Sequence, residues 1–226
     1  MMNPYPDFPL SMALQNDMPV VLSGLGLFWV ARMIGAAHPA AGRLALAGFA
    51  LIVTAGALKA TWKLVMAIAR LDIPLLSQSL FPFIAPGFSL MAWALFWSKR
   101  NSDRALVWWP PVLVSAAALL GALALSITRT DRTWVFVLIG LSTVANVGLA
   151  GLLVHSALQH GSYLAAGLFA LNLLITFALS AIAGMSNKPL EVHWTEQIIS
   201  TLSNLGFAWA AWTMIHIRPR LRSLTA

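Results

Sequence analysis

Two lysines stand one helical turn apart in an otherwise apolar stretch of the chain, Lys59 and Lys63, with Trp62 beside the second. Residues four positions apart share one face of a helix. A lysine near the centre of a membrane helix costs about 2.5–3.5 kcal/mol on insertion scales, so such residues usually face a bundle interior or a water-filled cavity. Lys63 is nearer the helix end, where a long side chain reaches the surface. Lys59 therefore carries more of the inference that a cationic cavity lies within the membrane.

Polar residues in other apolar stretches supply partners for these lysines. We predict a ligand-binding set that combines both lysines with an aromatic ring, a carboxylate and two amides: Lys59, Trp62, Lys63, Asn172, Glu196 and Asn204. Three interpretations stay open. They are a structural ion pair between a lysine and Glu196, a site for an anionic or amphiphilic small molecule, and a lysine that loses its proton during a proton-coupled cycle.

Membrane-spanning helices are the elements that must position these residues. The chain is 59% hydrophobic and only 9% charged, with a mean hydropathy of +0.80, which is typical of a polytopic membrane protein. Backbone groups in hydrocarbon must bond within the protein, so seven long apolar stretches with short connections predict an all-α integral membrane fold, a seven-helix bundle. The expected spans are residues 19–37, 44–69, 79–98, 106–127, 134–155, 162–184 and 197–217.

Basic residues are divided unequally between the two sets of connections. With the C-terminus in the cytoplasm, the inner side holds Arg32, Arg43, Lys99, Arg100, Arg104, Arg218, Arg220 and Arg222, and the outer side holds Arg70, Arg129, Arg132 and Lys188. The positive-inside rule therefore predicts an extracytoplasmic tail, residues 1–18, and a cytoplasmic basic tail, residues 218–226. The lysine cavity then opens outward. Topology explains the net charge of +7 better than a nucleic-acid surface does, and the compact, Ala-rich chain suits a bacterial inner (plasma) membrane.

A set of residues recurs at one fixed offset of 119 positions. Gly42 and Gly48 recur as Gly161 and Gly167. A second cluster recurs as well: Gln78, Gly87, Phe88, Ala92 and Trp93 return as Gln197, Gly206, Phe207, Ala211 and Trp212. Four spans separate the copies, which predicts a parallel 3+1+3 repeat, with repeat 1 over 19–98, helix 4 as connector over 106–127 and repeat 2 over 134–217. The alternative is convergent use of Gly, Ala and Trp in helix packing.

This plan resembles, in architecture alone, the sugar transporters of the SWEET class, the PQ-loop carriers and the nicotinamide riboside carriers, and in helix number the rhodopsins. The resemblance implies a transport or ligand-binding role by analogy. The residues depart from two of these patterns, because no Pro-Gln pair ends the first or fifth span and residues 197–217 contain no lysine for a retinal Schiff base. In the second repeat the two lysines are replaced by Ala178 and Ile182, the divergence expected where one copy acquires a binding site.

Helix breakers and histidines are the other residues with functional potential. Pro82, Pro86 and Gly87 are expected to form a hinge, because they interrupt the third span and free backbone carbonyls. Histidines fall near the predicted interfaces, where we expect them to contact headgroups and loop carbonyls, and the sequence predicts no metal or other cofactor. Cysteine is absent, which excludes thiolate chemistry. The nearest approach to an acid–base cluster is a polar group in the loop before the last span, Glu191, His193, Glu196 and Gln197.

Three functions are consistent with these residues. The leading hypothesis is a small-molecule carrier, channel or ligand-binding receptor with an outward-facing cavity near Lys59 and Lys63. The second is an accessory or assembly subunit, which binds another membrane protein or a second copy of itself through Gly- and Ala-rich helix faces. The third and least favoured is a membrane-embedded enzyme acting on lipids or isoprenoids. The expected partners are the lipid bilayer, an anionic or amphiphilic small molecule and a membrane-protein or homo-oligomeric partner, and no nucleic acid.

Overall fold

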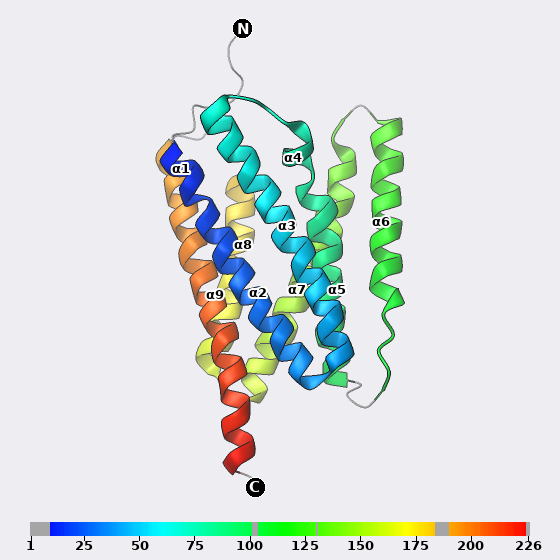
Figure 1. The fold of residues 1–226 in the computed structure, drawn as a ribbon, viewed down its shortest axis with the longest axis vertical. Coiled ribbons are helices and arrows are strands. Elements are labelled where there is room, and N and C mark those ends of the chain that lie inside the picture. Colours follow the sequence, from blue (N-terminus) through cyan, green and yellow to red (C-terminus); the bar gives the residue numbers. More distant parts are fainter. Residues whose placement is uncertain (1–9, 101–103, 130, 184–189, 225–226) are drawn as a thin grey trace.

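The computed structural model describes residues 10–100, 104–129, 131–183 and 190–224, and the regular elements in these ranges are all helices (Figure 1). They are α1 (Leu10–Gln15), α2 (Asp17–Ala37), α3 (Pro39–Ala69), α4 (Pro74–Gln78), α5 (Leu80–Arg100), α6 (Trp109–Thr128), α7 (Thr133–Gln159), α8 (Tyr163–Ala183) and α9 (Leu190–Leu224). Seven segments in this part of the chain are long and apolar enough to cross a membrane. The prediction of an all-α, seven-helix membrane bundle is confirmed.

Three helix boundaries differ from those expected. The second span begins at Pro39 and not near residue 44, and the last long helix covers Leu190–Leu224 where 197–217 was expected. In addition, Leu10–Gln15 forms α1 inside the segment expected to be a tail. Helices in proteins are stabilised mainly by packing against neighbours, so they continue through polar residues that interrupt an apolar stretch of sequence.

Within the described residues, the long helices other than α6 form a closed ring. Around this ring α2 packs on α3, α3 on α5, α5 on α7, α7 on α8, α8 on α9, and α9 returns to α2. α6 packs outside the ring against α5 and α7, and Figure 1 shows it at one side of the bundle. The two short helices α1 and α4 lie at the same end, which we call the Lys63 end. The α2–α3 turn lies at the opposite end.

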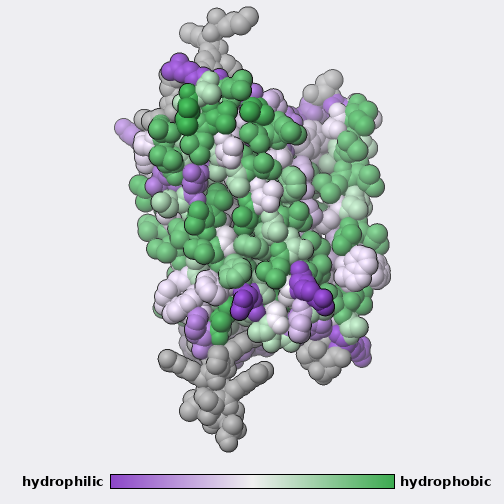
Figure 2. Space-filling model, in the orientation of Figure 1, coloured by the Kyte–Doolittle hydropathy of each residue, from purple (hydrophilic) through white to green (hydrophobic). Residues whose placement is uncertain are grey.

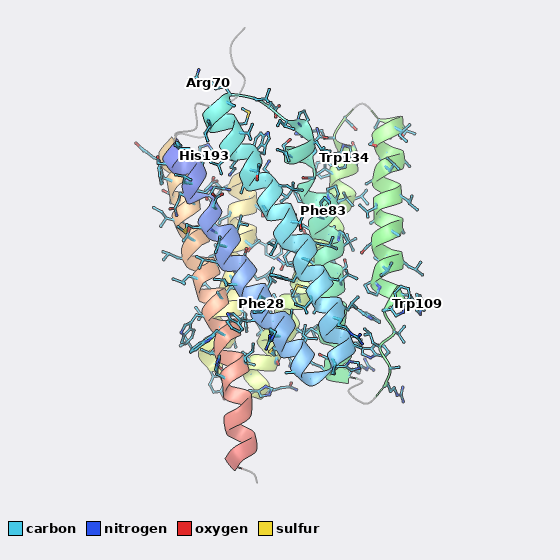
Figure 3. All side chains as sticks on the ribbon, in the orientation of Figure 1. Phe28, Arg70, Phe83, Trp109, Trp134 and His193 are labelled. Atoms are coloured by element: carbon cyan, nitrogen blue, oxygen red, sulfur yellow. The ribbon has the colours of Figure 1, made fainter. Side chains whose placement is uncertain are left out.

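The outer surface of the bundle is apolar between its two ends. Figure 2 shows this for one face, where hydrophobic side chains cover the middle and hydrophilic ones gather toward the top and bottom. Large side chains such as Ile127 and Phe136 are 78% and 70% exposed, which suits contact with lipid and not with water. In Figure 3, Arg70 and His193 lie at the Lys63 end and Trp109 lies near the other end. The surface therefore fits a lipid bilayer with polar groups at both interfaces.

Small residues allow the ring helices to approach one another closely. α3 and α5 meet at Gly48 and Gly87, where a Cβ atom on Gly48 would lie 2.6 Å from the Gly87 carbonyl oxygen, and one on Gly87 would lie 2.6 Å from the Ile52 side chain. α2 and α9 meet at Gly26, where a Cβ atom would lie 2.4 Å from the Phe207 ring. Close approach at glycine is a common way to pack membrane helices, because lipid supplies no hydrophobic force between them.

The three expected hinge residues have different surroundings. Pro86 lies inside α5, which is assigned as one helix from Leu80 to Arg100. Pro82 lines a cavity between α5, α6 and α7, and Gly87 packs tightly on α3. The helical run of the third span is interrupted earlier, at Ser79 between α4 and α5. Motion at Pro82, Pro86 and Gly87 stays a prediction.

His38, between α2 and α3, makes two hydrogen bonds with its ring, one to α3 and one to the segment before α6. Nδ1 accepts a hydrogen bond from the Ala41 backbone N–H at 3.2 Å and caps α3, while Pro39 occupies the first turn. Because Nδ1 is the acceptor, the ring proton is on Nε2, which donates to the Arg104 carbonyl oxygen at 3.0 Å. The contact with a loop carbonyl is the structural role expected for an interfacial histidine. It ties the α2–α3 turn to the segment that leads into α6.

Replacing Gly87 by alanine is expected to destabilise the bundle, because the added methyl group overlaps α3. Overpacking of this kind costs about 1–3 kcal/mol. Gly140 in α7 is the matched control, since a Cβ atom there meets nothing within 4 Å. Thermal unfolding of the purified protein in nanodiscs should give a lower midpoint for Gly87→Ala and no loss for Gly140→Ala. Equal midpoints for the two variants would contradict the close contact between α3 and α5.

Two substitutions at His38 separate the cap from the contact with Arg104. Asparagine keeps an acceptor for the N-terminal N–H groups of α3, whereas alanine removes it at a cost of about 1 kcal/mol. Both variants lose the contact to the Arg104 carbonyl. We expect the unfolding midpoint to fall in the order wild type, His38→Asn, His38→Ala. If the two variants unfold at the same temperature, His38 does not contribute as a cap.

Candidate functional site

Lys59 and Lys63 lie near the C-terminal end of α3, and both are half-buried. α3 continues unbroken to Ala69, and the chain turns at Arg70, which has a left-handed φ of 52°. Both lysines therefore belong to the helical part of the bundle, at its Lys63 end. There α1 packs on α3, and residues of α9 line a cavity together with the lysines. In the structure Lys63 lines one cavity and Lys59 lines two.

The Lys59 ammonium contacts an aromatic face. Its Nζ lies 4.1 Å from the centre of the Trp62 ring, a cation–π contact. The Trp62 Nε1–H in turn donates a hydrogen bond to the Asp72 carboxylate at 2.8 Å. Asp72 follows the end of α3, so this chain of contacts fixes the ring from one side and places the lysine on the other. Trp62 was predicted as a site residue, and the structure gives it a contact with Lys59.

Lys63 is held by the junction between α1 and α2. Its Nζ donates a hydrogen bond to Asn16 Oδ1, and the Gln197 side-chain amide of α9 donates to the same oxygen at 3.0 Å. Next to it, the Gln15 side-chain amide donates to the Thr201 hydroxyl at 3.1 Å. These bonds join segments 181 and 186 residues apart in the chain. They connect the start of α2 to both α3 and α9.

Sequence reasoning missed Asn16 and Gln15, because both were assigned to a tail outside the membrane. A signal for them exists in the sequence. Gln15, Asn16 and Asp17 form a run of polar residues directly before an apolar stretch, and a short helix precedes it. Asn16 itself lies in the turn between α1 and α2, which leaves its side chain free of helix packing on one side and able to reach two neighbouring helices.

Two cavities of about 230 Å³ each meet at Lys59. The inner cavity is mostly apolar and lies among α2, α3, α5 and α9. Its lining is Asn16, Pro19, Val20, Ser23, Ile52, Val53, Gly56, Lys59, Leu80, Ile84 and Asn204. The outer cavity is more polar and is lined by Ala13, Lys59, Trp62, Lys63, His193, Glu196 and Gln197. Each cavity has the volume of roughly eight liquid water molecules at about 30 Å³ apiece.

Carboxylate and imidazole groups from α9 complete the outer cavity. His193 Nδ1 and Glu196 Oε2 are 3.6 Å apart, and the Glu196 and Asp17 carboxylates attract the Lys63 ammonium. Glu191 and His193 were expected in a loop, and this expectation is wrong, whereas for Glu196 a place in the first turn of a helix was the alternative to the loop. They lie in the first turns of α9, because that helix begins at Leu190. An i,i+3 spacing then brings His193 and Glu196 to the same side of the helix.

Asn172 lies apart from the other predicted ligand-binding residues. Its side-chain amide donates to the Ser203 hydroxyl at 2.9 Å in a groove between α8 and α9. The groove is lined by Leu168, Leu171, Asn172, Ile175, Ile199, Leu202, Ser203 and Gly206. The remaining predicted residues, Lys59, Trp62, Lys63, Glu196 and Asn204, all line the inner or the outer cavity.

Equivalent positions at the offset of 119 line both the inner cavity and the α8–α9 groove. The pairs are Ile52 with Leu171, Val53 with Asn172, Gly56 with Ile175, Leu80 with Ile199 and Ile84 with Ser203. At this offset α2 corresponds to α7, and α5 corresponds to α9. The contact of α2 with α9 therefore matches the contact of α7 with α5. Lys59, in contrast, is matched by Ala178, which is exposed on α8.

Comparison with known proteins finds no matching protein-family model, no matching curated protein and no matching solved structure. The residues around the two cavities are therefore the features that bear on function. Those residues combine a cationic boundary, a polar compartment on one side of it and an apolar compartment on the other.

Trp62 variants test the contact chain that holds Lys59. Trp62→Phe keeps an aromatic face and loses the hydrogen bond to Asp72, whereas Trp62→Leu loses both interactions, each about 1 kcal/mol. We expect Trp62→Leu to unfold at a lower temperature than Trp62→Phe. In a Lys59→Met background this difference should shrink, because no ammonium remains to contact the ring. A difference of the same size in both backgrounds would show that the cation–π contact contributes nothing measurable.

Proposed function

We propose that this protein is a small-molecule carrier, channel or ligand-binding receptor whose site is formed by the inner and outer cavities, and that its ligand is a small amphiphilic anion. The observation that carries the proposal is the position of Lys59, which lines both cavities. An anionic group at this boundary meets the ammonium. The apolar part of the same molecule then has the Val20, Ile52 and Ile84 side chains to pack against.

The surroundings of the two ammonium groups support an anionic ligand. Among the described residues, Lys59 contacts the Trp62 ring and makes no salt bridge to a carboxylate, while Lys63 donates to a neutral amide oxygen. A charge in an apolar bundle is stabilised best by an opposite charge. The Asp72 carboxylate attracts the Lys59 ammonium, which Arg132 repels, and the Glu196 and Asp17 carboxylates attract the Lys63 ammonium. An incoming anion would add a further negative charge beside the two ammonium groups.

The relation between the two halves of the chain supports a transport role. The parallel 3+1+3 repeat remains our proposal, and the matching lining positions of the inner cavity and the α8–α9 groove favour it over convergent helix packing. Carriers built from repeats place their sites between the repeated units. The inner cavity includes Asn204 of α9 and Ile52 of α3, one from each half.

Orientation follows from charge, with the cavities on the extracytoplasmic side of a plasma membrane. The eight basic residues assigned to the cytoplasmic side outnumber the four assigned to the other side. The Lys63 end, where the outer cavity lies, then faces outward. An anion would approach from that side and enter the outer cavity, where it meets Lys59, Lys63 and Gln197.

A thermal-shift measurement with three matched compounds tests this function. Benzoate, benzylamine and benzyl alcohol share one ring and differ in charge. We expect benzoate to raise the unfolding midpoint of the wild type in nanodiscs, because a ligand at 100 times its Kd adds about 2.7 kcal/mol to stability. Benzylamine and benzyl alcohol should give smaller shifts. Lys59→Met should lose the benzoate shift.

Arg129→Gln is the matched control for the loss of one positive charge, since Arg129 is exposed at the end of α6 and lines neither cavity. It should keep the benzoate shift in full. The alternative functions give different results. An assembly subunit would show no shift in either protein, and an enzyme of lipids or isoprenoids would respond to lipid ligands and not to benzoate. Equal benzoate shifts in wild type and Lys59→Met would contradict the proposed site.

A further inference from the structure

One oxygen atom at the boundary between the cavities accepts two hydrogen bonds from two different helices. Asn16 Oδ1 receives the Lys63 ammonium of α3 and the Gln197 amide of α9. An ammonium group and an amide N–H that converge on one oxygen form a pair of donors suited to a carboxylate or another oxyanion. A charged acceptor binds such donors more strongly than a neutral amide oxygen does.

Asn16 and its two donors line different cavities. Asn16 lines the inner cavity, whereas its two donors, Lys63 and Gln197, line the outer one. An anion in the outer cavity therefore meets both donors while Asn16 still occupies them. Lys59 lines both cavities, so the anion also meets this ammonium there, but to take over Lys63 and Gln197 it must compete with the Asn16 oxygen.

We propose that the Asn16 side chain is a displaceable latch, whose amide oxygen holds the position of a ligand oxyanion until an anion takes over Lys63 and Gln197. The proposal rests on the proposed function and identifies the residue that controls access to the same site. The ligand oxygen replaces Asn16 Oδ1 on both donors. The Asn16 side chain then rotates away, and the outer and inner cavities become one continuous space.

Neighbouring contacts allow this rotation without unfolding the junction. Gln15 holds the end of α1 to α9 through the Thr201 hydroxyl, independently of Asn16. Asn16 lies in the turn between α1 and α2, and its own side chain makes no cap bond to the α2 backbone. The side chain is therefore free to change rotamer while the backbone on either side stays in place.

The latch has no counterpart at the positions 119 residues away. There Asn16 is matched by Val135 and Lys63 by Ile182, and only Gln197 has an equivalent, Gln78. The polar junction occurs once among these paired positions, with Asn16 and Lys63 in the half that also carries Lys59 and Gln197 in the other half. This coincidence of the latch with the cationic boundary supports a shared role in ligand access.

Two substitutions at Asn16 test the latch in opposite directions. Asn16→Asp places a permanent carboxylate on Lys63 and Gln197, and we expect it to weaken benzoate binding by about tenfold or more. Asn16→Ala vacates both donors, and we expect it to bind benzoate about tenfold more tightly than the wild type, the value of one hydrogen bond to a charged group. Benzoate affinity is measured by thermal shift in nanodiscs.

A second readout, labelling of a single introduced cysteine, needs no bound ligand. It is specific because the chain contains no cysteine of its own. Ser23→Cys places a thiol on the lining of the inner cavity, and Asn204→Cys provides an independent second position. Labelling by an anionic methanethiosulfonate should be about tenfold faster with Asn16→Ala than with wild-type Asn16 and slower with Asn16→Asp, in line with the affinity change. Thr195→Cys, exposed on the first turns of α9, is the control whose labelling should not change.

The outcomes separate the latch from the proposed function. If benzoate binds through Lys59 but Asn16→Ala changes neither affinity nor labelling, the latch is wrong and the binding site stands. If Asn16→Ala accelerates labelling of Ser23→Cys but no variant binds benzoate, the anion displacement and the proposed function are both overturned. If Asn16→Asp binds benzoate like the wild type, the Asn16 oxygen does not occupy the ligand position.

Discussion

The cost of placing two ammonium groups within an apolar bundle is the constraint on which the site depends. Lysine at membrane depth is unfavourable by a few kcal/mol unless polar or aromatic groups surround it. In the structure, polar and aromatic groups from several segments lie around the two ammonium groups. They are the Trp62 ring, the Asn16 amide, the Gln197 amide of α9 and the carboxylates near the Lys63 end. Two of these partners are themselves held by a further hydrogen bond, Trp62 by Asp72 and Asn16 by Gln197. The two cavities lie among these groups because their side chains converge there without filling the space.

Close helix packing in other parts of the bundle allows these side chains to converge around open space at the Lys63 end. Where Gly48 meets Gly87 and Gly26 meets Phe207, backbones approach and the ring of helices closes. The same helices diverge enough at the Lys63 end to leave cavities. A bundle whose helices were separated everywhere by large side chains would not combine a rigid ring with an open compartment. Van der Waals contact at small residues is the main attractive force available between helices in lipid, so its location decides where cavities are able to form.

Hydropathy alone predicted the seven helices and the class of fold, because apolar length is a local property of the sequence. It also placed Lys59, Lys63 and Trp62 together, since one helix fixes their spacing. Hydropathy did not predict which segments distant in the chain contact one another. Asn16 and Gln15 were read as part of a tail, and their partners on α9 are more than 180 residues away. Asn172 was grouped with the lysines by depth in the membrane, yet it lies between α8 and α9, because depth does not determine which neighbours a helix face meets.

Positions 119 residues apart differ in the polar side-chain contacts that they make at the two corresponding helix junctions. Gln15 and Thr201 form a hydrogen bond between α1 and α9, and their counterparts 119 residues away, Trp134 and Pro82, line a cavity between α5, α6 and α7. A tryptophan and a proline there provide no equivalent bond between their side chains, and α6 packs against that junction from outside the ring. The unmatched helix thus covers the half of the bundle that lacks the polar link. At the Lys63 end of the other junction the short helix α1 packs on α2 and α3, and the hydrogen bonds of Gln15, Asn16 and Gln197 join this end to α9 beside the lysines.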